Sequence, residues 1–190
     1  MKRTASALFS LAMLAALIMT AGCPEPGKKD IKMDAPPPPA YSIEDLTRVR
    51  YSSRVSFLAP PDWKIIKRRG NPVMFAISPG GEKDGPLANL VIENISQRMA
   101  PDEYLRANIL SMRVSIDGLE FIKGGIETIR DRPTAWVRYK FPREGATIEA
   151  LAYCRTVDYK AYVLTATAPD EEFESIEPLF RTMGRSLQAD

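Results

Sequence analysis

The apolar residues of this chain follow two different spacings, and the changes between them mark out the secondary structure. Strand-like runs alternate polar and apolar residues or form short apolar blocks, and proline, glycine and aspartate turns bound them. These runs occupy residues 51–58, 63–69, 73–78, 87–96, 119–129, 134–141, 148–157 and 160–168. The last two are apolar or small on both faces. Because a strand covered on both sides lacks a polar face, we expect helices above and below the sheet.

A helical spacing separates the fourth strand-like run from the fifth. Apolar residues recur there at intervals of four, three and four, which places them on one helix face: Leu105, Ile109, Met112 and Ile116. Pro101 suits the first helical position, and the acids that follow it complement the positive end of the helix dipole. The Asp117-Gly118 pair predicts the end of this helix.

A second helical spacing lies at the end of the sequence, carried by Phe173, Ile176, Phe180, Met183 and Leu187. Pro178 conflicts with a helix that begins near Pro169, because an interior proline costs about 3 kcal/mol. We therefore expect Ser175 to cap a new helix start, with Pro178 in the first turn, where its missing N–H is not needed.

The first 22 residues have the layout of a secretory signal peptide. Lys2 and Arg3 form a positive start, residues 5–19 are an apolar run, and small residues follow it. The apolar run is shorter than the hydrocarbon core of a bilayer requires, which argues against a spanning helix. We expect residues 1–22 to be removed by cleavage between Gly22 and Cys23.

Cys23 follows the Ala-Gly pair directly, and this arrangement resembles the lipobox of bacterial lipoproteins. The resemblance implies that the thiol is acylated and attaches the chain to membrane lipid, although Thr20 stands where the pattern usually has leucine. The alternative is an ordinary signal peptide that leaves a free thiol. Pro24, in place of the aspartate that resembles an inner-membrane retention signal, favours an outer membrane location facing the periplasm.

We expect residues 23–48 to form a lipidated, proline-rich tether and residues 49–190 to form one globular domain of ordinary size. The run from Pro36 to Pro39 is typical of a stiff polyproline II spacer. The net charge of +2 becomes zero once Lys2 and Arg3 are removed with the signal, since those 22 residues contain no acids. The charge therefore gives no indication of nucleic-acid binding.

The order of elements, with VSFLAPPDW early, YVLTATA late and F…F…SL in the last helix, resembles the PsbP-like and DcrB-like families. The resemblance covers residues 50–188 and implies an α+β fold, an α/β/α sandwich around an antiparallel sheet. It also implies a non-enzymatic role as an envelope lipoprotein, assembly factor or chaperone-like binder. The calcium or manganese handling of some PsbP proteins is not carried over, because the sequence has no histidine and no carboxylate cluster at ligand spacing.

Catalytic patterns are missing from the sequence. The absence of histidine excludes Ser-His-Asp and Cys-His mechanisms, and residues 79–86 lack the order of a phosphate-binding loop and predict a hairpin tip. The adjacent acids at 170–172 are explained by a helix start, and Glu93 inside a strand is a single carboxylate. Cys154 is predicted to be a small buried side chain. We expect no catalytic residue, no cofactor and no metal.

One charged stretch is a candidate contact surface. Around Trp63 lie the basic residues Lys64, Lys67, Arg68 and Arg69. They could contact anionic headgroups, at about 1 kcal/mol per basic residue, or they could simply be the solvated end of a strand with the tryptophan in the core. Trp136 and Tyr139 are expected to pack against the sheet rather than bind a ligand.

Three functions remain open from the sequence. The first is an envelope lipoprotein whose body binds a protein partner or supports assembly. The second is a small-ligand or lipid-binding module, which requires an apolar cavity between sheet and helices. The third is a hydrolase, which requires carboxylates that converge in a cleft.

Overall fold

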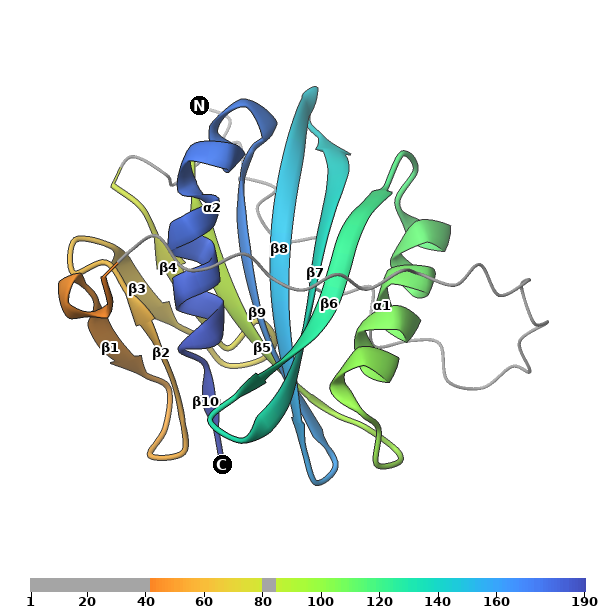
Figure 1. Ribbon diagram of the computed structural model, residues 1–190. Helices are drawn as coiled ribbons and strands as arrows, with labels where there is room; N and C mark the ends of the chain where they lie inside the picture. The colour runs from red at the N-terminus through yellow and green to blue at the C-terminus, as the bar shows by residue number, and fades with distance from the viewer. Residues whose placement is uncertain (1–41, 80–84) are drawn as a thin grey trace, which may run out of the picture.

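A seven-stranded antiparallel sheet forms the centre of the protein (Figure 1). The computed structural model describes residues 42–79 and 85–190. The strand order is β3-β4-β5-β9-β8-β7-β6. The bounds are Lys64–Lys67 for β3, Met74–Ile77 for β4, Leu87–Asn94 for β5, Glu120–Ile129 for β6, Arg132–Arg143 for β7, Ala146–Val157 for β8 and Lys160–Pro169 for β9. All seven correspond to strand-like runs in the sequence.

One helix lies on each face of this sheet. α1 (Pro101–Ser115) packs against β6, β7 and β8, and α2 (Asp170–Arg185) packs against β8 and β9 on the other face. The alternation along β7 shows the two faces directly, because Ala135 and Val137 belong to the core under α1 while Trp136 belongs to the core under α2. The predicted α+β fold, with helices on both faces of an antiparallel sheet, is confirmed.

A second, smaller sheet lies against α2 and was not predicted. It contains β1 (Thr47–Arg50), β2 (Val55–Ala59) and β10 (Gln188–Ala189), in the order β1-β2-β10, and follows a short 3-10 helix, η2 (Ile43–Asp45). Every residue of β2 is buried. β2 and α2 share one hydrophobic core, so α2 lies between the two sheets.

The first helix forms as its sequence predicts. It begins at Pro101, and the Glu103 carboxylate accepts a hydrogen bond from the Ala100 N–H at 3.0 Å. Leu105 and Ile109 are buried against the sheet, whereas Met112 and Ile116 are partly buried and pack on the same core.

The second helix begins earlier than its sequence predicts, so the prediction of a start at Ser175 was wrong. α2 begins at Asp170 and contains Pro178 in its interior, while the Ser175 hydroxyl donates to the Glu172 carbonyl at 2.7 Å. The turns before the proline bury Phe173 completely and supply two acids to a buried arginine. These contacts outweigh the cost of about 3 kcal/mol for the proline.

The apolar set predicted for the second helix is confirmed as one core layer. Phe173, Phe180, Met183 and Leu187 are all at most 1% exposed, and Ile176 is partly buried against the same cluster. Leu187 lies just beyond the last helical residue, where it reaches the core from the segment that leads into β10.

Candidate functional site

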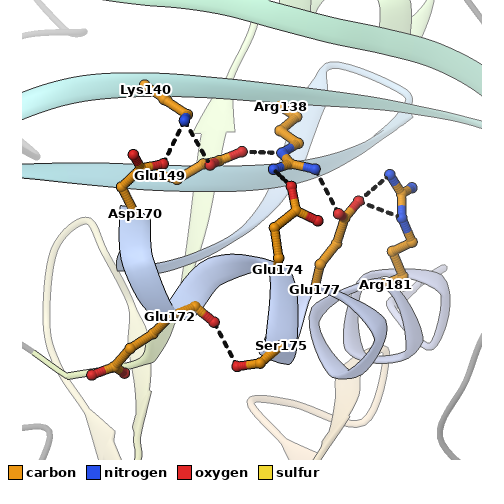
Figure 2. Close-up of polar contacts among 9 residues, drawn as sticks. All are labelled: Arg138, Lys140, Glu149, Asp170, Glu172, Glu174, Ser175, Glu177 and Arg181. Carbon is orange, nitrogen blue, oxygen red and sulfur yellow. Dashed lines mark hydrogen bonds and ion pairs between the residues drawn. The ribbon is translucent and has the colours of Figure 1, made fainter.

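A network of charged side chains occupies the interface between α2 and the sheet (Figure 2). Its centre is Arg138 on β7, whose guanidinium is ion-paired with Glu149 on the neighbouring strand β8 and with Glu174 and Glu177 on α2. The Arg138 Nη1 to Glu177 Oε2 distance is 2.6 Å. The side chains of Arg138 and Glu149 are only 6% and 1% exposed, so their charges compensate each other away from water.

The network extends in both directions along the helix. Glu177 also accepts from Arg181 one turn later, with 2.8 Å between Arg181 Nε and Glu177 Oε1. The Arg181 guanidinium carbon lies 4.5 Å from the centre of the Trp136 ring, a cation–π contact. At the other end, Lys140 bridges Asp170 and Glu149, with 3.5 Å between its Nζ and Glu149 Oε2.

The electrostatic effects follow from these contacts. Burial acts to lower the pKa of Arg138, but the bonds to Glu149 and Glu174 and the charge of Glu177 outweigh burial, and its pKa is raised. The bond from Arg138 lowers the pKa of Glu174. The pKa of Asp170 is lowered by its bond from Lys140. Arg138 is therefore charged at neutral pH, as are Glu174 and Asp170, which serve as acceptors for the neighbouring cations.

The ion pairs of this network hold α2 against the sheet. The Arg138 guanidinium also lies 4.6 Å from the centre of the Phe173 ring, so one of its faces as well as its N–H groups is in contact. Sequence reasoning missed the network, although Arg138 and Lys140 alternate on one strand and Glu174, Glu177 and Arg181 have helical spacing.

The carboxylate singled out in the sequence, Glu93, lies on the opposite face of the sheet. It accepts a hydrogen bond from the Tyr104 hydroxyl of α1, and Asn108 donates to the same hydroxyl at 3.2 Å. Burial, together with this bond to Glu93, raises the pKa of Tyr104. Cys154 is completely buried in the same core, as predicted. Glu93 thus ties β5 to α1 and is remote in the fold from the network under α2.

The predicted basic stretch is placed at one edge of the sheet, because β3 is a terminal strand in the sheet order. Lys64, Lys67, Arg68 and Arg69 are all exposed, and the Arg68 guanidinium carbon lies 5.2 Å from the Phe75 ring centre. Trp63 is buried and meets Phe180 edge to face, with 6.5 Å between ring centres. The structure does not bring these basic residues into the α2 network.

The two aromatic residues of β7 that the sequence singled out, Trp136 and Tyr139, pack as predicted. Trp136 is buried under Arg181 in the core beneath α2. Tyr139 is buried in the core beneath α1, where its ring lies 6.0 Å from that of Phe141, and burial raises its pKa. Neither ring is available as an exposed ligand platform.

Little space is left between α1 and the sheet. The space between α1 and the sheet near Leu105, Ile109 and Phe121 amounts to about 10 Å³, roughly the room that one water molecule needs. This space is far smaller than the apolar cavity that the small-ligand function requires.

A larger open cleft lies at one end of the sheet. Its volume is about 450 Å³, and the β8–β9 turn and the segment before β2 line it, with Arg54, Asn94, Tyr159, Lys160 and Asp190 among the lining residues. The wall mixes cations, acids and tyrosines. It contains two aspartates but no group of three acids, cysteines or histidines suited to a metal, and none occurs elsewhere in residues 42–79 and 85–190. No helix within those ranges is long and apolar enough to cross a membrane.

The architecture is shared with solved structures of distant sequence. Cyanobacterial PsbP (CyanoP) from Synechocystis sp. PCC 6803 superposes with a TM-score of 0.61 over 80% of this chain and 96% of its own, at 13% identity. The fold is PsbP-like. Comparison with known sequence families and with curated proteins finds no match for the sequence.

Two further structures share this PsbP-like fold. LpqN, involved in cell envelope biogenesis of Mycobacterium tuberculosis, matches with a TM-score of 0.55 and 15% identity over 77% of this chain and 93% of its own. The Saccharomyces cerevisiae Ran-binding protein Mog1p matches with a TM-score of 0.55 and 10% identity, over 76% and 95%. At these identities the likeness concerns the fold alone.

Proposed function

We propose that this protein is a membrane-anchored, non-catalytic binding or assembly factor of the bacterial cell envelope. Acylated Cys23 attaches it to membrane lipid after removal of residues 1–22. The proposed tether, residues 23–48, leads to the body, residues 49–190, and its last two residues, Thr47 and Arg48, already belong to β1. Cys23, Gly22 and most of the tether lie outside the described residues, so the proposal for the anchor rests on the sequence pattern.

The observation that carries the non-catalytic role is the use of the buried and partly buried carboxylates. Buried Glu149 and Glu177 accept from Arg138 across the α2–sheet interface, and partly buried Glu93 accepts from Tyr104. A hydrolase needs a carboxylate that faces substrate in a cleft. Here these acids connect elements of the fold, which favours a protein that acts through its surface.

The roles of two proteins with this fold agree with the proposal. LpqN is involved in cell envelope biogenesis, and Mog1p is a Ran-binding protein. We therefore propose a protein partner as well as the lipid anchor, and no nucleic acid. Pro24 after the cysteine supports an outer membrane location facing the periplasm.

The anchor is tested by Cys23→Ser in the full chain, with Cys154→Ser as the matched control. Cys23→Ser is expected to release the protein into the soluble fraction and to abolish labelling by a palmitate analogue. Cys154→Ser is expected to change neither result. Membrane association of Cys23→Ser, or unlabelled wild-type protein, would reject the lipoprotein assignment.

The binding role is tested separately by crosslinking the wild-type protein in its native membrane and identifying adducts by mass spectrometry. We expect a reproducible protein adduct that maps to residues 49–190. Turnover of an ester, amide or glycoside substrate by the purified protein, lost on substitution of a surface carboxylate, would contradict the non-catalytic role.

A further inference from the structure

The two faces of the seven-stranded sheet are covered unequally. α2 and the small sheet lie over one face, whereas α1 on the other face packs against β6, β7 and β8. Strands are spaced by about 4.8 Å, so seven strands span about 29 Å, and one helix is about 10 Å wide. The strands β3, β4 and β5 therefore extend beyond α1 by about the width of another helix (Figure 1).

Four apolar side chains gather on this uncovered part, which we call the open half-sheet: Ile66, Phe75, Ile77 and Leu87. Ile66 pairs with Phe75, and Ile77 pairs with Leu87, so the four occupy adjacent positions on three strands. Met74 and Ala76, which alternate with them on β4, are buried in the core under α2. The four consequently point to the α1 face, where each is partly exposed.

The open half-sheet is not an extension of the core under α1. That core includes its partly buried neighbours Val91 and Phe121, but none of the four apolar side chains of the open half-sheet belongs to it or to the core under α2. Toward α1 the surface becomes polar, with Asn89 on β5 and Thr165 and Thr167 on β9, all partly exposed. An occupant would need one apolar stripe and one polar side.

The rim of the open half-sheet is basic. Four of the six residues from 64 to 69 are lysine or arginine, and all four are exposed. Arg68 lies over the Phe75 ring, which places a positive charge beside the apolar patch. A partner whose apolar stripe is flanked by acids on the side that meets β3 would match this combination.

The shape of this face favours a helix over a lipid bilayer as the occupant of the open half-sheet. α1 rises above the sheet by about one helix diameter of 10 Å, so a flat membrane would meet α1 before it reached Phe75 or Ile77. A helix laid beside α1 would fill the step and cover the apolar side chains. A second copy of this chain would bring a second basic rim to the first.

We propose that the open half-sheet binds an acidic amphipathic helix of a partner protein, which lies beside α1 and extends the helical layer over β3, β4 and β5. This assignment deepens the proposed binding role and rests on it for the existence of a partner. The apolar side chains supply the buried contact, and the basic rim selects the acidic partner.

The test uses the full chain with Cys23→Ser and a fluorescent synthetic helix with a leucine stripe flanked by glutamates. A twin with lysine in place of each glutamate is the charge control. Fluorescence anisotropy is expected to show saturable binding of the acidic helix, weakened about tenfold by Ile77→Thr or Leu87→Thr, each of which removes an apolar contact. Val114→Thr, at an 84% exposed residue of α1, is the matched surface control and should bind like the parent chain. Thermal melting identifies variants that remain folded.

Several outcomes would overturn the assignment. They are no binding of the acidic helix, equal binding by the lysine twin, or folded Ile77→Thr and Leu87→Thr variants that bind like the parent. Binding of phosphatidylglycerol vesicles that depends on Ile77 would instead identify a lipid surface. Self-association lost in Ile77→Thr would identify a second copy as the occupant. A native crosslink elsewhere on the body, with no binding of the acidic helix, would reject this surface and leave the proposed function standing.

Discussion

Gly184 of α2 lies directly against the ring of Tyr153 on β8. A Cβ atom added to Gly184 would be only 2.1 Å from Cδ2 of that ring, with two more ring carbons within 2.6 Å. No side chain is tolerated at such a separation, so the last turn of α2 approaches the sheet as closely as its backbone allows. This contact lies at the end of α2 opposite the three acids that begin the helix.

Gly184→Ala is therefore expected to destabilise the fold, although alanine in place of glycine favours an isolated helix by about 1 kcal/mol. Overpacking of a tight core costs about 1–3 kcal/mol, and Tyr153 is completely buried with little room to shift. Chemical denaturation measures the change. Ser111→Ala, at an exposed position in α1, is the control and should leave the stability unchanged. A more stable Gly184→Ala variant would show that this interface is loose.

Arg138→Met is expected to lower the free energy of unfolding by about 3–5 kcal/mol, because it leaves the buried Glu149 without its main partner. Arg132→Met on the same strand is the matched control. Arg132 pairs with Asp190 at 3.6 Å, with side chains 49% and 65% exposed, and exposed pairs contribute at most about 1 kcal/mol. Urea denaturation compares the two variants. Equal losses would show that the network under α2 is solvated.

The pKa of Glu174, lowered by its bond from Arg138, predicts a dependence of stability on acid. Because the folded pKa lies below the ordinary value of 4.5, the unfolded chain takes up this proton first as the pH falls. The ion pair thus contributes fully above about pH 4.5 and is lost as the pH drops through the folded pKa. Since the Glu174 side chain is 75% exposed, we expect a contribution of at most about 1 kcal/mol.

Glu174→Gln should remove this part of the acid dependence while keeping the shape of the side chain. Denaturation midpoints between pH 3 and pH 7 measure it. Glu171→Gln, at an exposed position on the same turn, is the control that should retain the wild-type pH profile. A Glu174→Gln profile that superposes on that of the wild type would contradict the role assigned to this ion pair.

Cys154 is expected to be inert to thiol reagents in the folded protein. Its side chain is completely buried, and burial, with a smaller effect of Glu93, raises the pKa of the thiol, so little thiolate forms. With Cys23 replaced by serine, a disulfide reagent at pH 8 should react only after denaturant is added. A Val114→Cys variant, whose exposed thiol should react at once in the folded protein, verifies that the reagent is active. Rapid modification of native Cys154 would show that β8 opens under native conditions.

The local elements were predictable from sequence because their causes are local. Alternating or wholly apolar runs between turn residues identified the strands from Leu87 to Pro169, and helical spacing with Pro101 identified α1. The small sheet was not predictable, since β10 contains two residues and pairs with β2 across more than one hundred residues of chain. The start of α2 was missed because distant contacts, chiefly those of Arg138, hold the turns before Pro178.

The same contrast between local and distant causes limited the prediction of the site. The sequence identified exposed basic residues around β3 and a buried Cys154, which depend on local polarity. It did not identify the network around Arg138, because which charges meet depends on strand register and on the face that α2 covers. The sequence likewise does not distinguish the residues of the open half-sheet from other strand residues. Only the sheet order shows that α1 leaves them uncovered: Ile66, Phe75, Ile77 and Leu87.

The pairing of β10 with β2 imposes an order on the folding of the chain. Gln188 and Ala189 hydrogen-bond with β2 on the edge opposite β1, and Arg48 of β1 reaches the Gln188 side chain at 3.0 Å. While the chain emerges from a ribosome or a translocation pore, one edge of β2 stays unpaired until residues 188–189 have emerged and can form β10. Loop closure over such a separation is entropically costly and slow. The small sheet is therefore completed only after residues 188–189 have emerged, and until then the edge of β2 that β10 covers is the part that a chaperone would need to protect.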